Sequence, residues 1–296
     1  MSSGSGVLLV DKPAGLSSAA VVARIRKRHG IAKIGHGGTL DPFASGLLVL
    51  LVGEGTKIAR FLLEGEKSYE AEASTLFETD TEDHTGQRLS PADSRPLSGA
   101  SLRGTLPQFV GRIRQVPPRY SALKKDGLPY YERARRGEEA TPDERDAVVR
   151  SLELLHAADG SFRFRVSCGG GTYVRSLARD WARAAGGTAH LTALKRLSSS
   201  QFRLEEALSL ESLLEIRPLP LIPIPEALAH LPRIVCSGEL AGKIRLGHPK
   251  AREEIARGWS HPPGFALAME TGDPVAVVSL HHGTAEIERV FGSASP

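Results

Sequence analysis

Residues 35–52 read GHGGTLDPFASGLLVLLV. The first half is a glycine-rich loop that presents one carboxylate, Asp41, and the second half is an apolar run, residues 47–52, typical of a buried strand. Glycine has no Cβ and lets the backbone come close to a bound molecule. Loops held by a rigid scaffold often carry catalytic groups. Because Asp-Pro pairs are far more often turn elements, Asp41 is only a candidate on these residues alone.

The flanking segments predict a mixed α and β fold. Residues 7–10 are an apolar run ended by a turn cluster, and Ser17 or Ser18 can cap a helix whose inner side is apolar. Residues 162–168 alternate apolar and polar side chains, the period-2 pattern of a half-buried strand. Further strands are predicted at 68–76 and 148–156, and helices at 56–63, 98–110 and 172–185.

Composition and length are those of a globular protein. Of the 296 residues, 41% are hydrophobic and 24% are charged, so the chain can bury a core. This length suggests about two domains. Residues 218–225 contain four prolines and predict a linker. We therefore expect a catalytic domain over residues 1–225, with a partly helical insertion at about 117–147, and a small β-rich domain over residues 226–296.

Cysteine usage and the N-terminus bear on the compartment. Cys168 and Cys236 are far apart and belong to no Cys/His cluster, so neither a zinc site nor a disulfide scaffold is expected. Residues 1–6 lack the basic and apolar regions of a signal peptide. The apolar run at 47–52 is too short to cross a bilayer. These features predict a soluble, cytoplasmic protein that holds no metal and contacts no membrane.

The net charge of +4 hides two strongly basic segments. Residues 103–136 carry nine lysines and arginines against two acidic residues, a net +7. Residues 172–203 carry six against one, a net +5. Tyrosines lie within both segments, at 120, 130, 131 and 173. Cations for phosphates together with rings for stacking are typical of proteins that bind unpaired RNA, although charged runs are usually only solvated surface.

Several motifs in register resemble those of the TruB-type tRNA pseudouridine synthases. The loop at 35–46 is close to that family's GHTGTLDPxAxG pattern, with Gly37 where the family usually has Thr. The other matching stretches are GVLLVDKPAGLSS (6–18), KSY (67–69), TDT (79–81), YSALK (120–124), GTYVRS (171–176) and LKRL (194–197). So many motifs in the same order are hard to produce by chance.

The resemblance implies a fold and an activity. The fold is α+β, a pseudouridine synthase catalytic fold with a mixed, mostly antiparallel sheet flanked by helices and loops, followed by a small PUA-type domain. The activity is isomerisation of uridine to pseudouridine in the T-loop of tRNA, at position 55. The base is flipped out, its glycosidic bond is broken, and the base is rejoined through C5. The family needs no cofactor, metal or guide RNA, and we expect a monomer.

The resemblance also assigns roles to residues. Asp41 is the catalytic carboxylate, Arg175 pairs with it, and Tyr69 stacks on the flipped uracil, where its phenol can take the C5 proton. Whether Asp41 attacks C1′ or C6 stays open. Substrate contacts are expected from His36 beside the flipped base, from Tyr173 and Leu194 in the pocket, and from Lys12, Lys124, Lys125 and Arg133 on phosphates.

Other interpretations remain. From sequence alone Tyr69 is more often a half-buried strand residue, and Arg175 is equally a surface phosphate contact. The chain is alternatively a pseudouridine synthase for a different RNA, or a non-catalytic module that binds RNA or assists tRNA folding. The presence of both Asp41 and Arg175 favours the enzyme.

Overall fold

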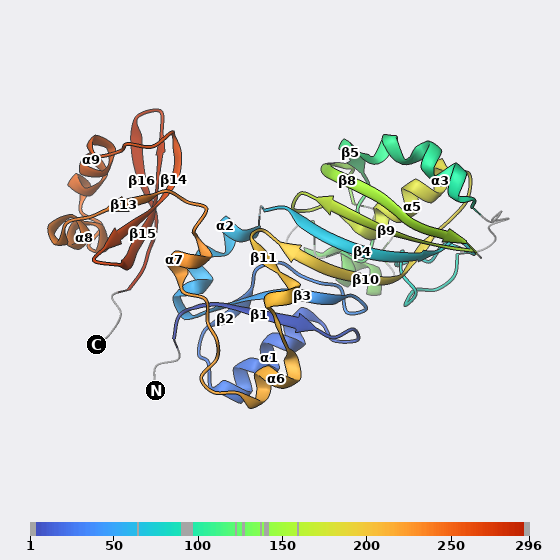
Figure 1. Cartoon of the computed structure of the whole chain (residues 1–296), viewed down its shortest axis with the longest axis horizontal. Coiled ribbons are helices and arrows are strands. Elements are labelled where there is room, and N and C mark those ends of the chain that lie inside the picture. The colour runs from blue at the N-terminus through green and yellow to red at the C-terminus, as the bar shows by residue number, and fades with distance from the viewer. Residues whose placement is uncertain are drawn as a thin grey trace.

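The structure is a computed structural model that describes residues 4–63, 65–89, 97–121, 123–125, 128–136, 138, 142–158 and 160–292. Figure 1 shows a long twisted sheet flanked by helices, with a small C-terminal part at one end of it. The expected fold class, α+β with a mixed and mostly antiparallel sheet and a small β-rich C-terminal part, is confirmed.

Within the described residues the large sheet has ten strands, and its main order is β12-β1-β3-β10-β4-β9-β8-β5. Two short strands lie off this path, because β2 pairs with β3 and β11 with β10. The strands are β1 (Gly6–Lys12), β2 (Ile34–His36), β3 (Ser45–Val52), β4 (Lys67–Ser74), β5 (Gly111–Gln115), β8 (Arg145–Ala158), β9 (Ser161–Cys168), β10 (His190–Ser199), β11 (Phe202–Arg203) and β12 (Leu208–Ser209).

Apart from the edge strand β12, which pairs in parallel with β1, the sheet consists of two antiparallel halves that meet at a short parallel contact. β3 pairs with β1, and β10 pairs with β4, along nearly their whole lengths. Between β3 and β10 only Ser45 pairs with Lys195 and Gly46 with Arg196. The loop that carries Asp41 ends at this junction, so Asp41 lies where the two halves of the sheet join.

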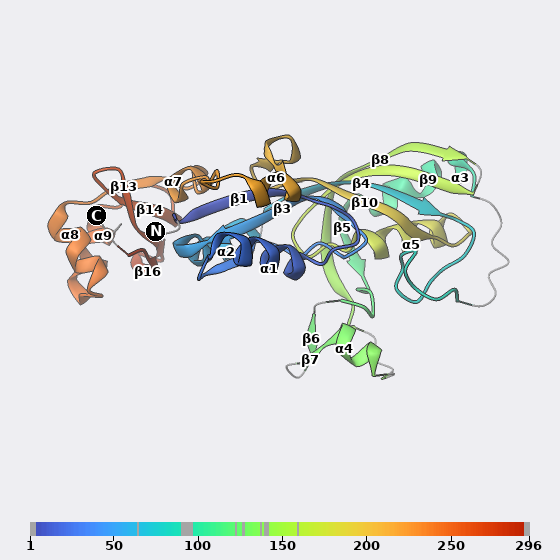
Figure 2. The ribbon, with the colours of Figure 1, turned by 90° about the horizontal axis from the view of Figure 1, so that it is seen from below.

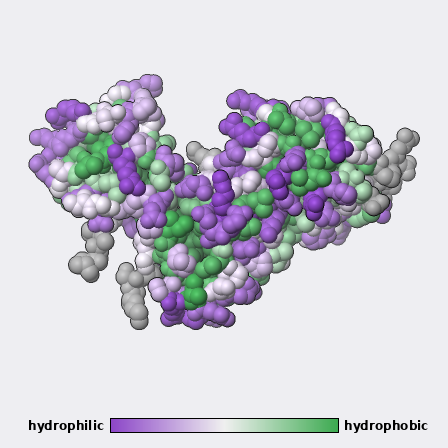
Figure 3. Space-filling model, viewed as in Figure 1, coloured by the Kyte–Doolittle hydropathy of each residue, from purple (hydrophilic) through white to green (hydrophobic). Residues whose placement is uncertain are grey.

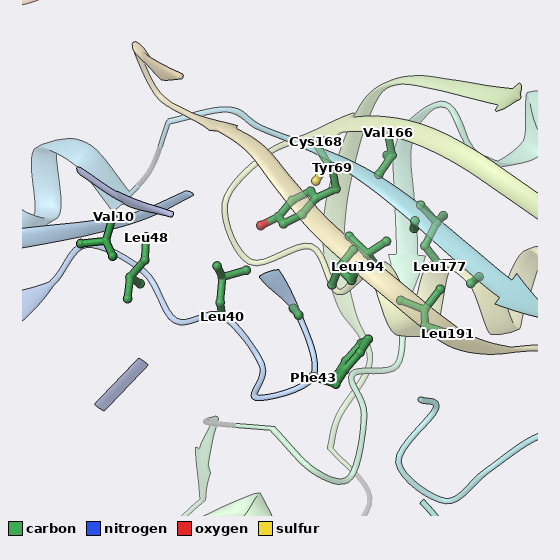
Figure 4. Packing of buried hydrophobic residues seen from close by; sticks show 14 of the residues in the cluster. Val10, Leu40, Phe43, Leu48, Tyr69, Val166, Cys168, Leu177, Leu191 and Leu194 are labelled. Atoms are coloured by element: carbon green, nitrogen blue, oxygen red, sulfur yellow. The ribbon is translucent and has the colours of Figure 1, made fainter. Parts of the chain in front are cut away.

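Helices cover the sheet and bury apolar side chains against it. The helical elements of this part are α1 (Ser18–His29), η1 (Gly53–Ile58), α2 (Ala59–Leu63), α3 (Gly99–Thr105), η2 (Leu106–Phe109), α5 (Val174–Ala184), η3 (Leu204–Glu206), α6 (Leu210–Glu215) and α7 (Ile224–Ala227). Figure 4 shows the core running from Val10 and Leu48 past Leu40 to Leu194 and Leu177. Side chains on both sides of the Asp41 loop therefore belong to the same packed cluster, which holds the loop rigidly.

The α5 helix is anchored by its aromatic residue. Trp181 is fully buried, meets Phe162 and Phe164 edge-on at 5.3 and 5.6 Å, and donates its indole N–H to the carbonyl of Leu102 at 3.0 Å. Buried aromatic pairs of this kind contribute about 0.5–1.5 kcal/mol beyond their burial. These contacts fix α5 against the sheet, and with it the start of the helix, which carries Arg175.

The segment at 117–147 contains a small projecting unit. It includes the hairpin strands β6 (Lys124–Lys125) and β7 (Leu128–Pro129) and the helix α4 (Tyr130–Arg135). In Figure 2 this unit stands away from the sheet on the side where α1 and α2 lie. The described residues of this segment are partly helical, and its bounds as an insertion stay a prediction.

The C-terminal part is a four-stranded sheet with two helices. Its elements are β13 (Arg233–Val235), α8 (Gly238–Arg245), α9 (Pro249–Arg257), β14 (Gly264–Glu270), β15 (Asp273–His281) and β16 (Thr284–Val290). It shares an apolar cluster with the large sheet, in which Leu267 and Phe291 pack together with Leu9 and Val49. The division of the chain near residue 225 stays a prediction.

In the described chain no helix combines the length and the apolar character needed to span a bilayer.

Candidate active site

A cavity of about 260 Å³ opens at the junction of the two half-sheets. Its lining includes five of the residues expected at the site: Asp41, Tyr69, Tyr173, Arg175 and Leu194. They come from the loop before β3, from β4, from the start of α5 and from β10, which are far apart in sequence. The fold therefore brings these residues together, and their individual roles stay predictions.

Asp41 and Arg175 form an ion pair in this cavity. Nη2 of Arg175 donates to Oδ1 of Asp41 at 3.2 Å, and Nε lies 2.9 Å from Oδ2. The Arg175 side chain is 4% exposed, whereas the Asp41 side chain is 33% exposed. Two-point contact with a planar guanidinium fixes the orientation of a carboxylate. Asp41 is thus held from behind while remaining accessible from the cavity.

Arg175 is itself fixed by acceptors outside the cavity. Nη1 donates to the carbonyl of Thr81 at 2.7 Å and lies 3.7 Å from Oδ2 of Asp83, and Nη2 donates to the carbonyl of Tyr120 at 3.0 Å. A buried guanidinium needs such partners because an uncompensated charge is costly to bury. These contacts leave Arg175 one orientation, in which it faces Asp41.

Two further residues hold the Asp41 loop through its backbone. Ser18 accepts from the Leu40 N–H at 2.9 Å and donates to the Leu40 carbonyl at 3.1 Å. Arg196, 1% exposed, donates from Nε to the Leu47 carbonyl at 2.7 Å and reaches the carbonyls of Thr39 and Gly38 at 3.4 Å. The loop is therefore bonded on both sides of Asp41.

Gly46 has to be glycine for this arrangement. Its φ is +96°, a left-handed conformation that L side chains rarely adopt. A Cβ there would lie 2.4 Å from the carbonyl oxygen of Arg196. The close approach of β3 to β10 directly after the Asp41 loop depends on this residue.

The structure contradicts the expectation that Lys12 contacts phosphate. Lys12 is fully buried, and Nζ donates to the carbonyls of Leu16 at 2.7 Å, Pro13 at 2.9 Å and Pro42 at 3.4 Å. Burial lowers its pKa to about 8, partly offset by the charge of Asp41. Through these bonds Lys12 holds the turn that follows β1 close to Pro42, the residue after Asp41.

Tyr69, Leu194 and Tyr173 form the apolar side of the cavity. Tyr69 is 8% exposed, and burial raises the pKa of its phenol. In Figure 4 its hydroxyl points from β4 toward the side on which Leu40 lies. The backbone of Tyr173 is held by the Gln115 amide, which accepts from its N–H at 2.8 Å and donates to its carbonyl at 3.0 Å. These rings give the cavity an apolar wall beside the Asp41–Arg175 pair.

His36 lies outside the cavity lining, half-buried at the end of β2. Burial is the main cause that lowers its imidazole pKa, with the charge of Arg196 adding to the effect. Gly37, which follows it, donates its N–H to the Val49 carbonyl at 2.8 Å. Neither residue lines the cavity in this structure, so the expected contact of His36 with RNA stays a prediction.

The basic segments serve different purposes. In the segment at 172–203, Arg175 and Arg196 are buried in the site, Arg179 pairs with Glu82, and Arg183 pairs with Glu78 at 2.6 Å. Three of the six cations of this segment thus have carboxylate partners and Arg196 binds backbone carbonyls, whereas Lys195 and Arg203 are exposed. The interpretation of the segment as RNA-binding surface stays a prediction. In the insertion, Arg133 is paired with Glu138 at 3.0 Å. The side chains of Lys124 and Lys125 lie outside the described part of the structure.

Sequence reasoning missed Asp83 and the backbone role of Arg196. The TDT stretch pointed to the loop that holds Asp83, and the LKRL stretch contains Arg196, but neither stretch indicated which atoms these residues bind. Among the described residues no group of three or more His, Cys, Asp or Glu side chains is arranged to hold a metal ion.

Comparison with known proteins gives a consistent result. Residues 26–174 match the family model described as TruB family pseudouridylate synthase (N terminal domain). The chain is 43% identical over 258 residues to tRNA pseudouridine synthase B of Geobacter sulfurreducens, covering 86% of this chain and 85% of that protein. It is 39% identical over 300 residues to tRNA pseudouridine synthase B of Syntrophotalea carbinolica, covering 97% of this chain and 98% of that protein.

Solved structures resemble the fold. A chain in the crystal structure of a Cbf5-Nop10-Gar1 complex superposes with a TM-score of 0.73 at 24% identity, covering 96% of this chain and 84% of that one. A second chain, in the structure of an H/ACA RNP bound to a substrate RNA containing 2′-deoxyuridine, gives a TM-score of 0.69 at 22% identity, covering 97% of this chain and 85% of that one. At this identity the likeness concerns the fold alone.

Proposed function

The chain belongs to the TruB family of pseudouridylate synthases, and from this premise we propose that it isomerises a uridine in the T-loop of tRNA, at position 55, to pseudouridine. The observation that carries the proposal is the Asp41–Arg175 pair, a partly exposed carboxylate fixed by a buried guanidinium inside a cavity. A reaction that breaks and remakes one glycosidic bond needs a positioned carboxylate. It needs no redox change.

The substrate base reaches Asp41 only after leaving its stack. Extrusion costs a few kcal/mol and less in a strained loop than in a duplex, which favours a tRNA loop as substrate. The flipped uracil lies between the apolar wall of Tyr69, Tyr173 and Leu194 and the carboxylate of Asp41. Tyr69 stacks on the base, and Leu194 and Tyr173 fix its edge.

The chemistry divides between three residues. Asp41 attacks C1′ of the ribose or C6 of the base, and the N1–C1′ bond breaks. The base turns, C5 bonds to C1′, the bond to Asp41 breaks, and N1 takes up a proton. The proton on C5 leaves, and the phenol oxygen of Tyr69 is the candidate that takes it and passes a proton on to solvent. Arg175 acts through Asp41 and holds its two oxygens through the cycle.

The partner is tRNA, held by its T-arm. The projecting unit of β6, β7 and α4 grips the RNA through Lys124, Lys125 and Arg133, and His36 fills the space left by the flipped base. The C-terminal part, residues 226–296, is a PUA-like RNA-binding domain beside a catalytic domain of residues 1–225. The enzyme works as a monomer, without guide RNA or partner proteins, in the cytoplasm, where its substrate is found.

The test is direct. Purified protein is incubated with unmodified tRNA without any added cofactor, and the modified nucleotide is mapped. Pseudouridine at the T-loop position supports the proposal, with a T-loop U→C tRNA as matched control. Pseudouridine found only in another RNA would replace the substrate assignment. Tight tRNA binding without any pseudouridine would point instead to a binding or folding module.

A further inference from the structure

The helix α1 presents a compact basic surface that takes no part in the site described above. Arg24, Lys27 and Arg28 are exposed and follow one another at i, i+3 and i+4, so they share one face of the helix. We call these three residues the α1 basic face. Arg217, also exposed, donates from Nη2 to the Arg28 carbonyl at 2.8 Å and adds a fourth cation beside it.

The charge of this face is uncompensated within the described chain. Residues 12–40 contain no Asp or Glu, and none of the three side chains forms an ion pair with a described residue. Other exposed arginines do have carboxylate partners, as in Arg165–Glu70 at 3.1 Å and Arg252–Glu286 at 3.3 Å. Exposed cations without a carboxylate partner in the described chain also occur elsewhere, as at Arg112 and Lys195, but the α1 basic face gathers three of them on one side of a helix, in a stretch without Asp or Glu.

Stability of the helix does not account for the pattern. Like charges at i and i+4, as in Arg24 and Arg28, destabilise an isolated helix by about 0.2–0.5 kcal/mol. Cations near a helix C-terminus are favourable, and this explains Lys27 and Arg28, which lie in the last turn. It does not explain Arg24, which lies before that turn. A concentrated, unpaired cation cluster is suited to a polyanion.

The face is coupled rigidly to the catalytic loop. The N-terminus of α1 is bonded to Leu40 through Ser18 at 2.9 Å, and Nη2 of Arg26 near its other end donates to the Ile34 carbonyl at 3.1 Å. Both bonds reach the segment that leads to Asp41. A phosphate held on α1 is thus placed at a fixed distance from the carboxylate.

The overall shape puts the same face toward a bound RNA. In Figure 2, α1, the projecting unit and the C-terminal helices α8 and α9 all lie on one side of the large sheet. Figure 3 shows hydrophilic residues along the edge of the molecule formed by α1 and α6. α6 adds two exposed acids there, Glu211 and Glu215, neither of which pairs with a described cation, so the cations remain in excess.

We propose that the α1 basic face binds the phosphate backbone of the tRNA substrate, on the side of the catalytic loop away from the projecting unit, and so sets the register of the uridine over Asp41. This inference rests on the proposed function, because tRNA is its ligand. It adds a contact surface that the site motifs do not include.

The test neutralises the face with a triple variant, Arg24→Gln, Lys27→Gln and Arg28→Gln. Glutamine keeps a helix propensity close to that of lysine and arginine, so α1 is preserved. The matched control is Arg150→Gln, Arg165→Gln and Arg183→Gln, three exposed arginines that each have a carboxylate partner. Both variants lose the same net charge.

Binding to tRNA is measured across salt concentrations, together with single-turnover rates at saturating enzyme. The α1 variant is expected to bind about tenfold or more weakly, with a salt slope smaller by about 2–3, since each lost phosphate contact removes about 0.9. Its single-turnover rate at saturation also falls, because the uridine is no longer held in register over Asp41. Its melting temperature stays that of the wild type, which shows that it is folded. The control keeps the wild-type affinity and slope.

Two outcomes overturn the inference: an α1 variant with wild-type affinity and slope, or a control that weakens binding equally, which would reduce the effect to net charge. Failure of the proposed function looks different, because wild-type protein would then form no pseudouridine in tRNA at all.

Discussion

Glu82 and Arg179 form a buried ion pair one helical turn behind the pair of Asp41 with Arg175. Arg179 follows Arg175 by four residues on α5, and Nη1 of Arg179 contacts Oε1 of Glu82. Ser176 donates to the other carboxylate oxygen at 2.7 Å. The loop that carries Glu82 also supplies Arg175 with the Thr81 carbonyl. Glu82 thus holds its loop, which orients the active-site arginine, against α5.

We expect the Glu82→Gln variant to keep its substrate affinity and lose turnover. Removing the charge loosens the loop, so Arg175 holds Asp41 less firmly, and small misplacements of catalytic groups cost up to about a hundredfold in rate. A tenfold fall in kcat with little change in KM is expected in a tRNA assay. Glu82 is 8% exposed, and Arg179 keeps a second carboxylate partner in Asp180 at 2.8 Å, so its charge is not left unpaired in the variant.

The matched control for that prediction lies on the same helix. Arg183→Gln breaks the more exposed pair of Arg183 with Glu78, one turn further along α5. Exposed pairs contribute about 0–1 kcal/mol, and Glu78 lies three residues before Thr81, so this pair does not bind the residues that contact Arg175. The control should keep wild-type kcat. Equal kcat for the two variants would remove Glu82 from the positioning machinery.

Periodicity and caps predicted most of the large sheet and its helices. The strands β1, β3, β4 and β9 have apolar or alternating sequences, and α1 begins after Ser17, whose side chain accepts from the Ala20 N–H at 3.1 Å. The central strand β10 was not predicted. Its sequence, HLTALKRLSS, buries Arg196, Ser198 and Ser199 together with leucines, so neither an apolar run nor a clean alternation marks it.

The sequence identified the residues of the active site better than it identified the contacts that these residues make. Motif resemblance pointed to Asp41, Tyr69, Tyr173, Arg175 and Leu194, and all five line one cavity. Lys12 was misassigned because a lysine beside a turn has the same sequence pattern whether its ammonium faces solvent or three carbonyls. Charge counts failed at Arg179 and Arg183 for a related reason, since their acidic partners lie about a hundred residues earlier in the chain.

Replacement of Asp41 by Asn should abolish turnover and leave tRNA binding largely intact. The amide keeps the shape of the carboxylate but has neither its charge nor its nucleophilicity, and the surrounding phosphate contacts are untouched. Pseudouridine formation and tRNA affinity are measured on the same preparation. Because the side chain is only partly buried, the variant should melt near the wild-type temperature. Retained turnover in the folded variant would contradict the assignment of Asp41 as the catalytic carboxylate.

Activity should fall on the alkaline side as Lys12 loses its proton. The folded pKa of about 8 lies below the ordinary 10.5 because burial disfavours the charge. Deprotonation weakens the bonds of Nζ to the Pro42 and Leu16 carbonyls and removes a cation near Asp41. We expect kcat to decline with a midpoint near pH 8, and the decline to be absent from the already low activity of Lys12→Met.

Stability should change in the opposite direction over the same pH range. Between about 8 and 10.5 the unfolded chain binds more protons at Lys12 than the folded chain does, so this residue makes the free energy of unfolding rise with pH there. Thermal melts at pH 7.5 and 9 therefore separate the two effects. A parallel loss of activity and of folded protein would attribute the alkaline decline to unfolding instead.

Gly37→Thr tests the one departure from the family motif. The φ angle of Gly37 lies outside the left-handed range. A Cβ at this position would lie 3.6–3.7 Å from Val49, which is an ordinary van der Waals contact. A non-glycine residue that fits the native backbone stabilises by about 0.4–1 kcal/mol, because the unfolded chain loses freedom. We therefore expect the free energy of unfolding of Gly37→Thr to rise by this amount, measured by denaturant titration. Turnover should be unchanged. Gly46→Ala, with a clash against the Arg196 carbonyl, should instead destabilise. Destabilisation by Gly37→Thr would show that the loop needs glycine at both positions.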